Sequence, residues 1–269
     1  MKRFRLLWAF LVRDFQTESS YRVSFLLSLS GVFFTSVTYF FVSRLLNESV
    51  EPMLAQYDGD YFAFVLIGVA FGSYFGLGLT GFARALRQAQ TTGTLEAMMM
   101  TPVSVSTIVV GSAVWSYAFT TLRVVVYLLL GLLLGLRLQG ANYLAALVTL
   151  ILSVIAFASI GIVAAGVIMV IKRGDPVTTL FSSVATLVGG VFYPIEIMPE
   201  WLQMLARLLP LTYSLRAMRM ALLNGAPWSQ LLPDLLVIAG FAVVLFPLSL
   251  LVFRLAVEQA RADGTLAHY

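Results

Sequence analysis

The sequence predicts an all-α membrane protein with six transmembrane helices, and two observations lead to this prediction. The chain of 269 residues is 60% hydrophobic and only 11% charged, and its mean hydropathy is +0.92. Soluble domains carry about 25% charged residues, so this chain has too few charges for a surface that faces water. Charge-free runs of about 20 residues, the length that a bilayer requires, recur along it.

The first segment, residues 1–20, predicts an amphipathic helix that lies in the membrane interface. At helical spacing, Phe4, Trp8, Leu11 and Phe15 fall on one face, and the basic residues fall elsewhere. A signal peptide is disfavoured, because the apolar run 6–12 is short and no small-residue cleavage site follows it. An ordinary basic leader before the first span remains the alternative.

Apolar runs of spanning length then follow one another along a single predicted membrane domain, residues 1–269, with no internal repeat or low-complexity linker. The third and fourth runs are longer than a bilayer requires, so we expect them to tilt or to project into the cytoplasm. Pro247 is expected to bend the sixth. The six predicted spans are 23–43, 61–83, 103–136, 143–171, 176–195 and 235–253.

Basic residues predict that both termini of the predicted domain face the cytoplasm. With the N-terminus inside, the inner segments hold eleven basic residues and the outer segments five. The net charge of +4 is therefore a topology signal, and nucleic acid is not a predicted partner. The inner residues are Lys2, Arg3, Arg5, Arg13, Arg22, Arg84, Arg87, Lys172, Arg173, Arg254 and Arg261; the outer ones are Arg44, Arg137, Arg207, Arg216 and Arg219.

The cytoplasmic segment 84–104 is longer than a simple connection needs, and it carries the signals of a short helix. Gly93 allows a sharp bend. Thr94 can cap a helix that begins at Leu95, and Glu96 then lies in the first turn, where the helix dipole favours an acid. The helix is expected to end before Thr101-Pro102, because a residue that precedes proline avoids the helical conformation.

Methionines dominate the exposed side of that short helix, notably Met98 and Met99. Methionine is flexible and polarizable, which suits adaptable contacts with another protein. The alternative is that these side chains dip into the membrane interface and bind no partner.

The segment 196–231 predicts two short amphipathic helices on the outer side, with Pro210 between them. In the first, Trp201, Met204, Leu205 and Leu208 share one face. The second is expected to begin near residue 212, with Leu215, Met218 and Leu222 on one side and Arg216 and Arg219 on another. Both helices are too short to span a bilayer.

These two segments resemble the ABC type-2 transporter permeases. The run GTLEAMMMTPVS, residues 93–104, is similar to the family's first cytoplasmic loop. Residues 189–225 are similar to the family's segment after the fifth span, with a Phe-Tyr-Pro end, a Pro-x-Trp start and a Leu-Pro-Leu-Thr-Tyr break. The two motifs come in the family's order on a six-span chain, so the resemblance covers nearly the whole chain.

The resemblance implies roles for particular residues. In that family the first loop is a coupling helix that docks on a separate ATPase subunit, and the hairpin after the fifth span is re-entrant and caps the outer end of the pathway. A surface hairpin without function is the alternative for the second segment. The implied coupling residues are Gly93, Thr94, Leu95, Glu96, Met98, Met99, Thr101 and Pro102, and the implied outer-gate residues are Tyr193, Pro194, Trp201, Pro210, Arg216 and Arg219.

Several side chains in the predicted spans are candidates for a substrate path. A charge within a span is usually functional, so Arg123 is either a contact for a substrate phosphate or a side chain that snorkels to an interface. Gly68, Gly72 and Gly76 form a stripe of small residues, which predicts close helix packing. The path candidates are Phe71, Tyr74, Phe75, Arg123, Phe181 and Phe192.

Residue types that are rare or absent in the chain limit the reactions and metal sites that it can support. It has no cysteine and a single histidine, His268, so a thiol nucleophile, a thiolate metal site or a histidine-based metal site is not expected. A phosphate-binding loop needs a Gly-Lys pair, but the only lysines, Lys2 and Lys172, follow Met1 and Ile171. No catalytic residue, metal or cofactor is predicted in this chain, and ATP and Mg are expected on the partner ATPase.

The sequence therefore predicts the permease subunit of an ABC exporter in a bacterial cytoplasmic membrane. The implied partners are two ATPase subunits, a second permease chain that is identical or paralogous, and membrane lipids. The predicted substrate is amphiphilic: a drug, a lipid or a lipid-linked glycan. The alternatives are a lipid-modifying membrane enzyme and a scaffold that transports nothing.

Overall fold

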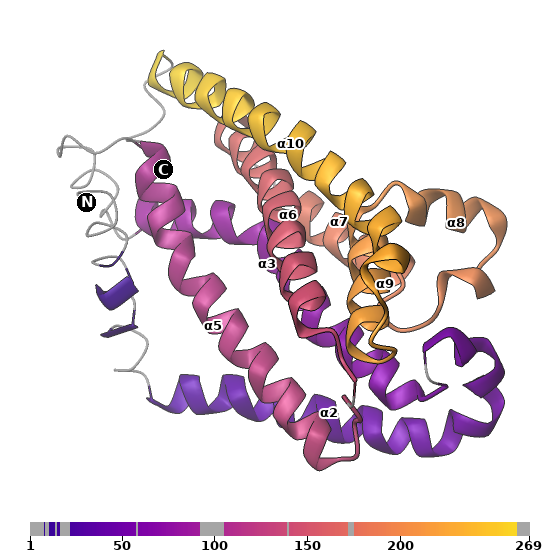
Figure 1. Cartoon of the computed structure of the whole chain (residues 1–269). Coiled ribbons are helices and arrows are strands. Elements are labelled where there is room, and N and C mark those ends of the chain that lie inside the picture. Colours follow the sequence, from indigo (N-terminus) through magenta and orange to yellow (C-terminus); the bar gives the residue numbers. More distant parts are fainter. Residues whose placement is uncertain are drawn as a thin grey trace.

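A computed structural model shows an all-helical chain (Figure 1). Every regular element in the described part of the chain is a helix, so the predicted class is confirmed. The helices are α2 (Arg22–Val50), η1 (Glu51–Tyr57), α3 (Tyr61–Thr91), α5 (Val105–Leu133), α6 (Tyr143–Ile171), α7 (Asp175–Val188), η2 (Ile195–Ile197), α8 (Glu200–Arg207), α9 (Pro210–Leu222) and α10 (Trp228–Ala262). The structure describes residues 8, 11–13, 15–16, 22–57, 59–91, 105–138, 140–171 and 175–262.

Five of the helices in the described residues are long and apolar enough to cross a membrane. Their apolar segments are Phe25–Leu46, Tyr61–Arg84, Ala113–Leu133, Tyr143–Ile168 and Trp228–Gln259. Five of the six predicted spans are thus matched by a helix of sufficient length. The match is closest at α6, whose bounds are those predicted for the fourth span.

The fifth predicted span, 176–195, is shorter than expected. Its helix, α7, has 14 residues and ends at Val188, which gives about 21 Å of helix against the ~30 Å of a bilayer core. The chain then turns through Gly190, whose φ of 84° is a left-handed conformation that glycine tolerates best. A count of six full spans therefore stays a prediction.

Helix ends also differ from the sequence prediction. Residues 84–91 continue α3 as helix, so the connection between α3 and α5 is 92–104 rather than 84–104. The sixth predicted span begins earlier, at Trp228, and α10 continues through both Pro233 and Pro247. The predicted outer segment 196–231 therefore includes the first turn of α10.

The core of the molecule lies where α3, α6, α9 and α10 meet (Figure 1). α10 lies along α6, and α9 fits between them and α3. α2 and α5 flank this core, and α2 is the least enclosed helix, with 11% of its apolar segment buried against 67% for α3. A smaller buried cluster around Phe82, Ile162 and Phe253 fills the other end of the bundle.

Close helix contact is achieved through glycine, as the stripe in α3 predicted. A Cβ at Gly68 would overlap the carbonyl oxygen of Val191, and a Cβ at Gly72 would lie 3.3 Å from the Val191 side chain. A Cβ at Gly76 would meet only the Ser182 hydroxyl, at 3.8 Å. The stripe therefore packs against α7 and the turn after it, within one chain, and α7 runs antiparallel to α3.

Polar contacts hold several connections together at one end of the bundle. The Asn142 side chain accepts from the Ala145 amide at 3.1 Å and so caps α6, while its Nδ2 donates to the carbonyl of Ala226. The side chain of Asn224 donates to the carbonyl of Gln56 at 2.9 Å. The segment after α9 thus shares an end with η1 and with the start of α6.

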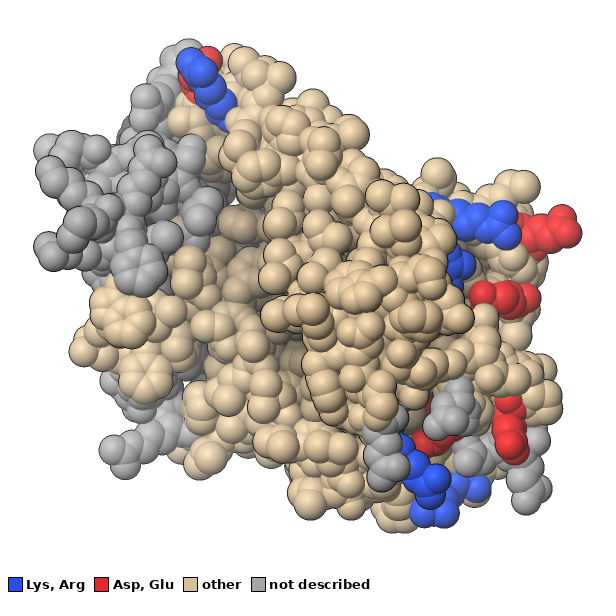
Figure 2. Space-filling view, viewed as in Figure 1, with Lys and Arg blue, Asp and Glu red and all other residues tan. Residues whose placement is uncertain are grey.

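Charged side chains gather toward the ends of the bundle. In Figure 2 an uncharged expanse crosses the middle of the visible face, and most red and blue atoms lie near the end that carries η1 and α8. An uncharged belt between two polar ends is the surface expected of a protein that crosses a bilayer.

The N-terminal segment is described at six positions, all of them helical. Trp8 is exposed, as an interfacial aromatic residue would be, and the ring of Phe15 packs edge-on against that of Trp115 at 5.5 Å. The rest of the predicted interfacial helix, 1–20, lies outside the described residues.

Candidate functional site

Arg219 is the most enclosed charged residue of the predicted outer hairpin. It lies on α9 and is 3% exposed. Its Nε donates to the carbonyl oxygen of Phe64 at 3.1 Å, its Nη1 to that of Gly190 at 2.8 Å, and its Nη2 to that of Val191 at 2.9 Å. All three groups of the guanidinium fork are therefore satisfied by backbone. Arg219 joins α9 to α3 and to the turn after α7.

Aromatic rings complete the surroundings of this guanidinium. The carbon at its centre lies 3.4 Å from the centroid of the Phe64 ring and 5.9 Å from that of Tyr57, distances at which a cation–π attraction acts. Burial lowers the pKa of Arg219 to about 9, so its charge is kept at neutral pH. Burial likewise raises the pKa of Tyr57 to about 12, against the opposing effect of Arg219, so this phenol is neutral.

Arg216 has a different environment from Arg219, although both lie on α9. It forms a two-pronged ion pair with Asp234 of α10, with 2.8 Å between Nε and Oδ2. The Asp234 carboxylate is buried, and its hydrogen bond with Arg216 raises the pKa of that arginine. A paired geometry of this kind is among the stronger charged contacts. It fixes α9 against the start of α10.

The two helices of the hairpin differ in exposure. Trp201 on α8 is 63% exposed, and the other apolar side chains that were predicted to share its face are exposed as well: Met204, Leu205 and Leu208. In α9, ten of 13 residues are buried, Arg219 among them. The alternative of a hairpin that lies on the surface therefore does not fit α9, and the re-entrant hairpin stays a prediction. α9 is an internal element, because residues of α3, α6 and α10 enclose it on several sides.

The remaining predicted gate residues lie before the hairpin and at the break between its two helices. Pro194 is buried and Tyr193 is half-buried in the segment that leads into η2. Pro210 is the first residue of α9, where its missing N–H costs no helical hydrogen bond. The structure therefore places Pro210 as a helix start, as well as the break between α8 and α9.

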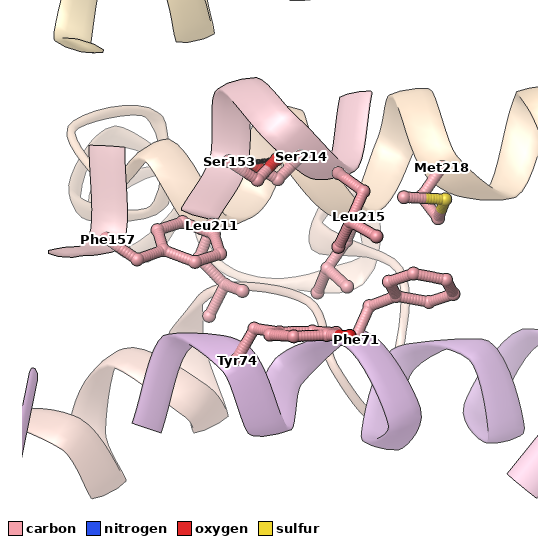
Figure 3. A pocket seen from close by; sticks show the side chains of 9 residues that line it. Phe71, Tyr74, Ser153, Phe157, Leu211, Ser214, Leu215 and Met218 are labelled. Atoms are coloured by element: carbon pink, nitrogen blue, oxygen red, sulfur yellow. Dashed lines mark hydrogen bonds between the residues drawn. The ribbon is translucent and has the colours of Figure 1, made fainter. Parts of the chain in front are cut away.

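Two predicted path residues of α3 face a small cavity beneath α9 (Figure 3). Phe71 and Tyr74 stack with 6.3 Å between ring centroids, and Leu215 and Met218 of α9 lie across from them. The free space admits about one water molecule. The cavity is therefore far too small for an amphiphile.

Hydroxyl groups border this cavity inside an apolar core. Ser153 of α6 donates to Ser214 of α9 at 2.8 Å, and Tyr74 donates to Thr121 of α5 at 2.9 Å. Burying hydroxyls is favourable only when they are hydrogen-bonded. These bonds therefore help to fix which helices meet here.

The other aromatic path candidates are not brought together. Phe75 is fully buried and meets the Phe157 ring edge-on at 5.2 Å. Phe192 stacks on Tyr39 at 6.2 Å, and Phe181 is 45% exposed on α7. Phe75 and Phe192 take part in packing between helices, and Phe181 faces away from the bundle.

Arg123 lies inside α5, ten residues before the end of that apolar helix. It is half-buried, and its Nε has no hydrogen-bond partner among the described residues. Leaving a charge at the centre of a membrane helix costs about 2.5–3.5 kcal/mol. Tyr117, also on α5, has a buried hydroxyl that is likewise without a partner there.

The predicted coupling residues, from Gly93 to Pro102, lie outside the described residues. They fall in 92–104, between the end of α3 and the start of α5.

Sequence reasoning missed the partners of the two hairpin arginines. Arg219 binds backbone carbonyls, which every residue carries, so no side-chain pattern could reveal them. Gly189-Gly190 is the one local signal, because such a pair indicates a turn. Asp234 could have been suspected, since an acid directly before an apolar run is normally paired when it is buried.

Comparison with protein families agrees with this architecture. The model of the family described as ABC-2 type transporter matches residues 5–223, which is most of the chain. A search of curated proteins found no match. The chain belongs to the ABC-2 type transporter family, and it is a membrane component of a transporter with several apolar helices.

Proposed function

We propose that this chain is the permease of an ATP-driven exporter, which moves an amphiphilic substrate outward across a bacterial cytoplasmic membrane. The observation that carries the proposal is the family match over residues 5–223, on a chain with five helices of spanning length in its described part. ATP and Mg are assigned to a separate ATPase subunit, because the sequence lacks the Gly-Lys pair of a phosphate-binding loop.

Coupling to that ATPase is assigned to 92–104, the connection between α3 and α5. Both helices are long and pack against each other, so a push on their connection would be passed along the bundle. Glu96 is the proposed ionic contact, since a carboxylate in a first helical turn favours that helix and can also accept from a basic groove.

Glu96 can be tested by separating its two roles. Glu96→Arg should insert normally but should abolish substrate-stimulated hydrolysis in the assembled complex, and Glu96→Gln should have a smaller effect. Charge reversal of the basic partner in the ATPase should partly restore coupling to Glu96→Arg, as in a double-mutant cycle. A fully coupled Glu96→Arg complex would show that another residue carries this contact.

The outer gate is assigned to the hairpin of α8 and α9. The contacts of Arg219 with α3 and of Arg216 with α10 support a hairpin whose inner helix moves together with those two helices. The exposed apolar face of α8, which includes Trp201, then lies at the rim of the pathway. In this arrangement the substrate passes between two permease chains, since the cavity beneath α9 admits only a water molecule.

The exporter assignment is tested by adding the ATPase. The purified permease should hydrolyse no ATP alone. Reconstituted with an ABC ATPase encoded beside it, it should confer vanadate-sensitive, substrate-stimulated hydrolysis and accumulation of an amphiphile in inside-out vesicles. A complex that assembles but whose ATP hydrolysis does not depend on this chain would instead indicate a scaffold. ATP hydrolysis by this chain alone would contradict the assignment of hydrolysis to a separate ATPase subunit.

A further inference from the structure

Arg123 lies well inside α5, which runs from Val105 to Leu133, with eighteen residues before it and ten after it in that helix. At 1.5 Å per residue, even the shorter of these stretches is about 15 Å of helix, which is farther than an arginine side chain extends. The snorkelling alternative is therefore disfavoured, because it requires a position near a helix end.

No described residue supplies Arg123 with a counter-charge. Its Nε–H is buried and donates to nothing there. Other arginines in the described part of the chain have hydrogen-bond partners for their side chains: Arg254 pairs with Glu258, and Arg84 donates to Thr80. A buried polar group without a partner in a native protein calls for an explanation, and an unseen ligand is one.

Among the described residues, a second, identical copy of the chain offers no free carboxylate within the apolar segments. Across the five apolar segments the only acids are Asp234 and Glu258, both in α10. Asp234 is paired with Arg216 and Glu258 with Arg254, and each lies near an end of its helix. Within the described part of the chain no acid is available to Arg123, so we look for its anion in another molecule.

The surroundings of Arg123 suit an approach from the bilayer. Its neighbours Leu122 and Val125 are 41% and 45% exposed on α5, and acyl chains can lie along such a surface. The planar guanidinium matches the geometry of phosphate and carboxylate oxygens and binds them through paired hydrogen bonds.

We propose that Arg123 binds the oxyanion of an anionic amphiphile, a phosphate or carboxylate headgroup, within the membrane. The proposal rests on the proposed exporter function and names the class of its substrate: lipid-like molecules with a negative charge. Drugs that are cations and neutral lipids are excluded from this contact.

The direct test is lipid binding to the purified permease in phosphatidylcholine nanodiscs. Fluorescent phosphatidic acid should bind the wild type saturably, Arg123→Lys somewhat more weakly, and Arg123→Gln at least about tenfold more weakly, which corresponds to about 1.4 kcal/mol. Arg44→Gln is the control, since Arg44 is exposed near the C-terminal end of α2 and its guanidinium lies 5.1 Å from the centroid of the Phe40 ring. Its affinity for phosphatidic acid should match the wild type.

Three further arms define the ligand. Fluorescent phosphatidylcholine and diacylglycerol should bind the wild type and Arg123→Gln alike, and millimolar inorganic phosphate should not displace phosphatidic acid. Equal affinity of the wild type and Arg123→Gln for phosphatidic acid would overturn the proposal. Displacement by inorganic phosphate would also overturn it, because the site would then take a free ion rather than an amphiphile.

Stability separates a ligand site from a structural one. In neutral lipid, Arg123→Met should melt at the same temperature as the wild type or higher, because it removes an unpaired charge from the bilayer. A clear loss of stability would reveal a partner within the protein and defeat the proposal. Added phosphatidic acid should raise the melting temperature of the wild type but not that of Arg123→Met.

The binding test can fail without the exporter test, and the exporter test can fail without the binding test. Binding is measured on the permease alone, whereas export requires the ATPase. A permease that binds phosphatidic acid through Arg123 but couples to no ATPase would contradict only the exporter. A working exporter whose lipid binding ignores Arg123 would contradict only the site.

Discussion

At the scale of single residues, Arg219 shows how a buried charge is accommodated without an acid beside it. Three carbonyl dipoles and the face of the Phe64 ring replace the water that the guanidinium loses on burial. Hydrogen bonds to charged groups contribute more than neutral ones, and a buried carbonyl left without its donor is costly. The arginine fork, rather than positive charge alone, is what this position requires.

Arg219→Lys is therefore expected to destabilise the protein although it keeps the charge. A single ammonium cannot reach carbonyls contributed by α3 and by the turn after α7 at once, so we expect a loss of about 2–4 kcal/mol from unpaired buried groups. Thermal unfolding in detergent, followed by circular dichroism, measures it. Arg207→Lys, at an exposed position on α8, is the control and should melt with the wild type.

The sequence could not reveal this role for a physical reason. Helical spacing placed Arg219 on the polar side of α9, and a polar side normally faces water. Backbone acceptors are present at every position and leave no mark in a sequence. By contrast, the apolar side of α9 was predicted correctly, because Leu215, Met218 and Leu222 are all buried.

At the scale of elements, the contact between α3 and the turn after α7 depends on missing side chains. Val191 and the Arg219 guanidinium occupy the space that a Cβ at Gly68 would fill. The spacing of Gly68, Gly72 and Gly76 predicted close packing, but only the structure distinguishes their individual surroundings.

Gly68→Ala and Gly76→Ala should therefore have opposite effects. Gly68→Ala forces backbone apart and should cost about 1–3 kcal/mol. Gly76→Ala adds a methyl group at ordinary contact distance from Ser182 and should gain up to about 1 kcal/mol from helix propensity. Melting temperatures in the same detergent test this, and a Gly68→Ala variant as stable as the wild type would show that the turn can move aside.

α8 gives a second prediction at this scale. Leu205→Pro removes an interior backbone donor from an eight-residue helix, at a cost of about 3 kcal/mol or more. Since the Leu205 side chain is 47% exposed, we expect the loss of helix stability to be confined to α8. Transport by the reconstituted complex should fall while its assembly, measured by gel filtration, is retained.

The matched control for that variant is Glu200→Pro. Glu200 is the first residue of α8, where proline is tolerated, so transport should be close to that of the wild type. Unchanged transport in Leu205→Pro would instead favour an inert hairpin on the surface.

Long apolar helices could be predicted well, whereas short ones could not. α6 has no charge from end to end, so its bounds follow from hydropathy alone. The apolar run 176–195 continues past Gly189-Gly190, where the helix has already ended. Hydropathy reports which residues avoid water and gives no information on where backbone hydrogen bonding stops.

At the scale of the whole molecule, the connections that share an end of the bundle are expected to face the same side of the membrane. Gln56 lies in η1, beside Asn224, and Gln90 lies in the last turns of α3. In the chain without cysteine, Gln56→Cys should react with a membrane-impermeant maleimide on intact cells, and Gln90→Cys should react only after permeabilisation. The reverse pattern would invert the predicted orientation.

The sparse burial of α2 has a consequence for how such a protein diverges over generations. Since 11% of its apolar segment is enclosed by the rest of the chain, most substitutions along α2 leave the α3, α6, α9 and α10 core unchanged. After a gene duplication, packing within the chain constrains this helix less than it constrains the core. A paralogous partner chain can therefore arise through changes in one helix, and comparison of such duplicates should show variation concentrated in Arg22–Val50.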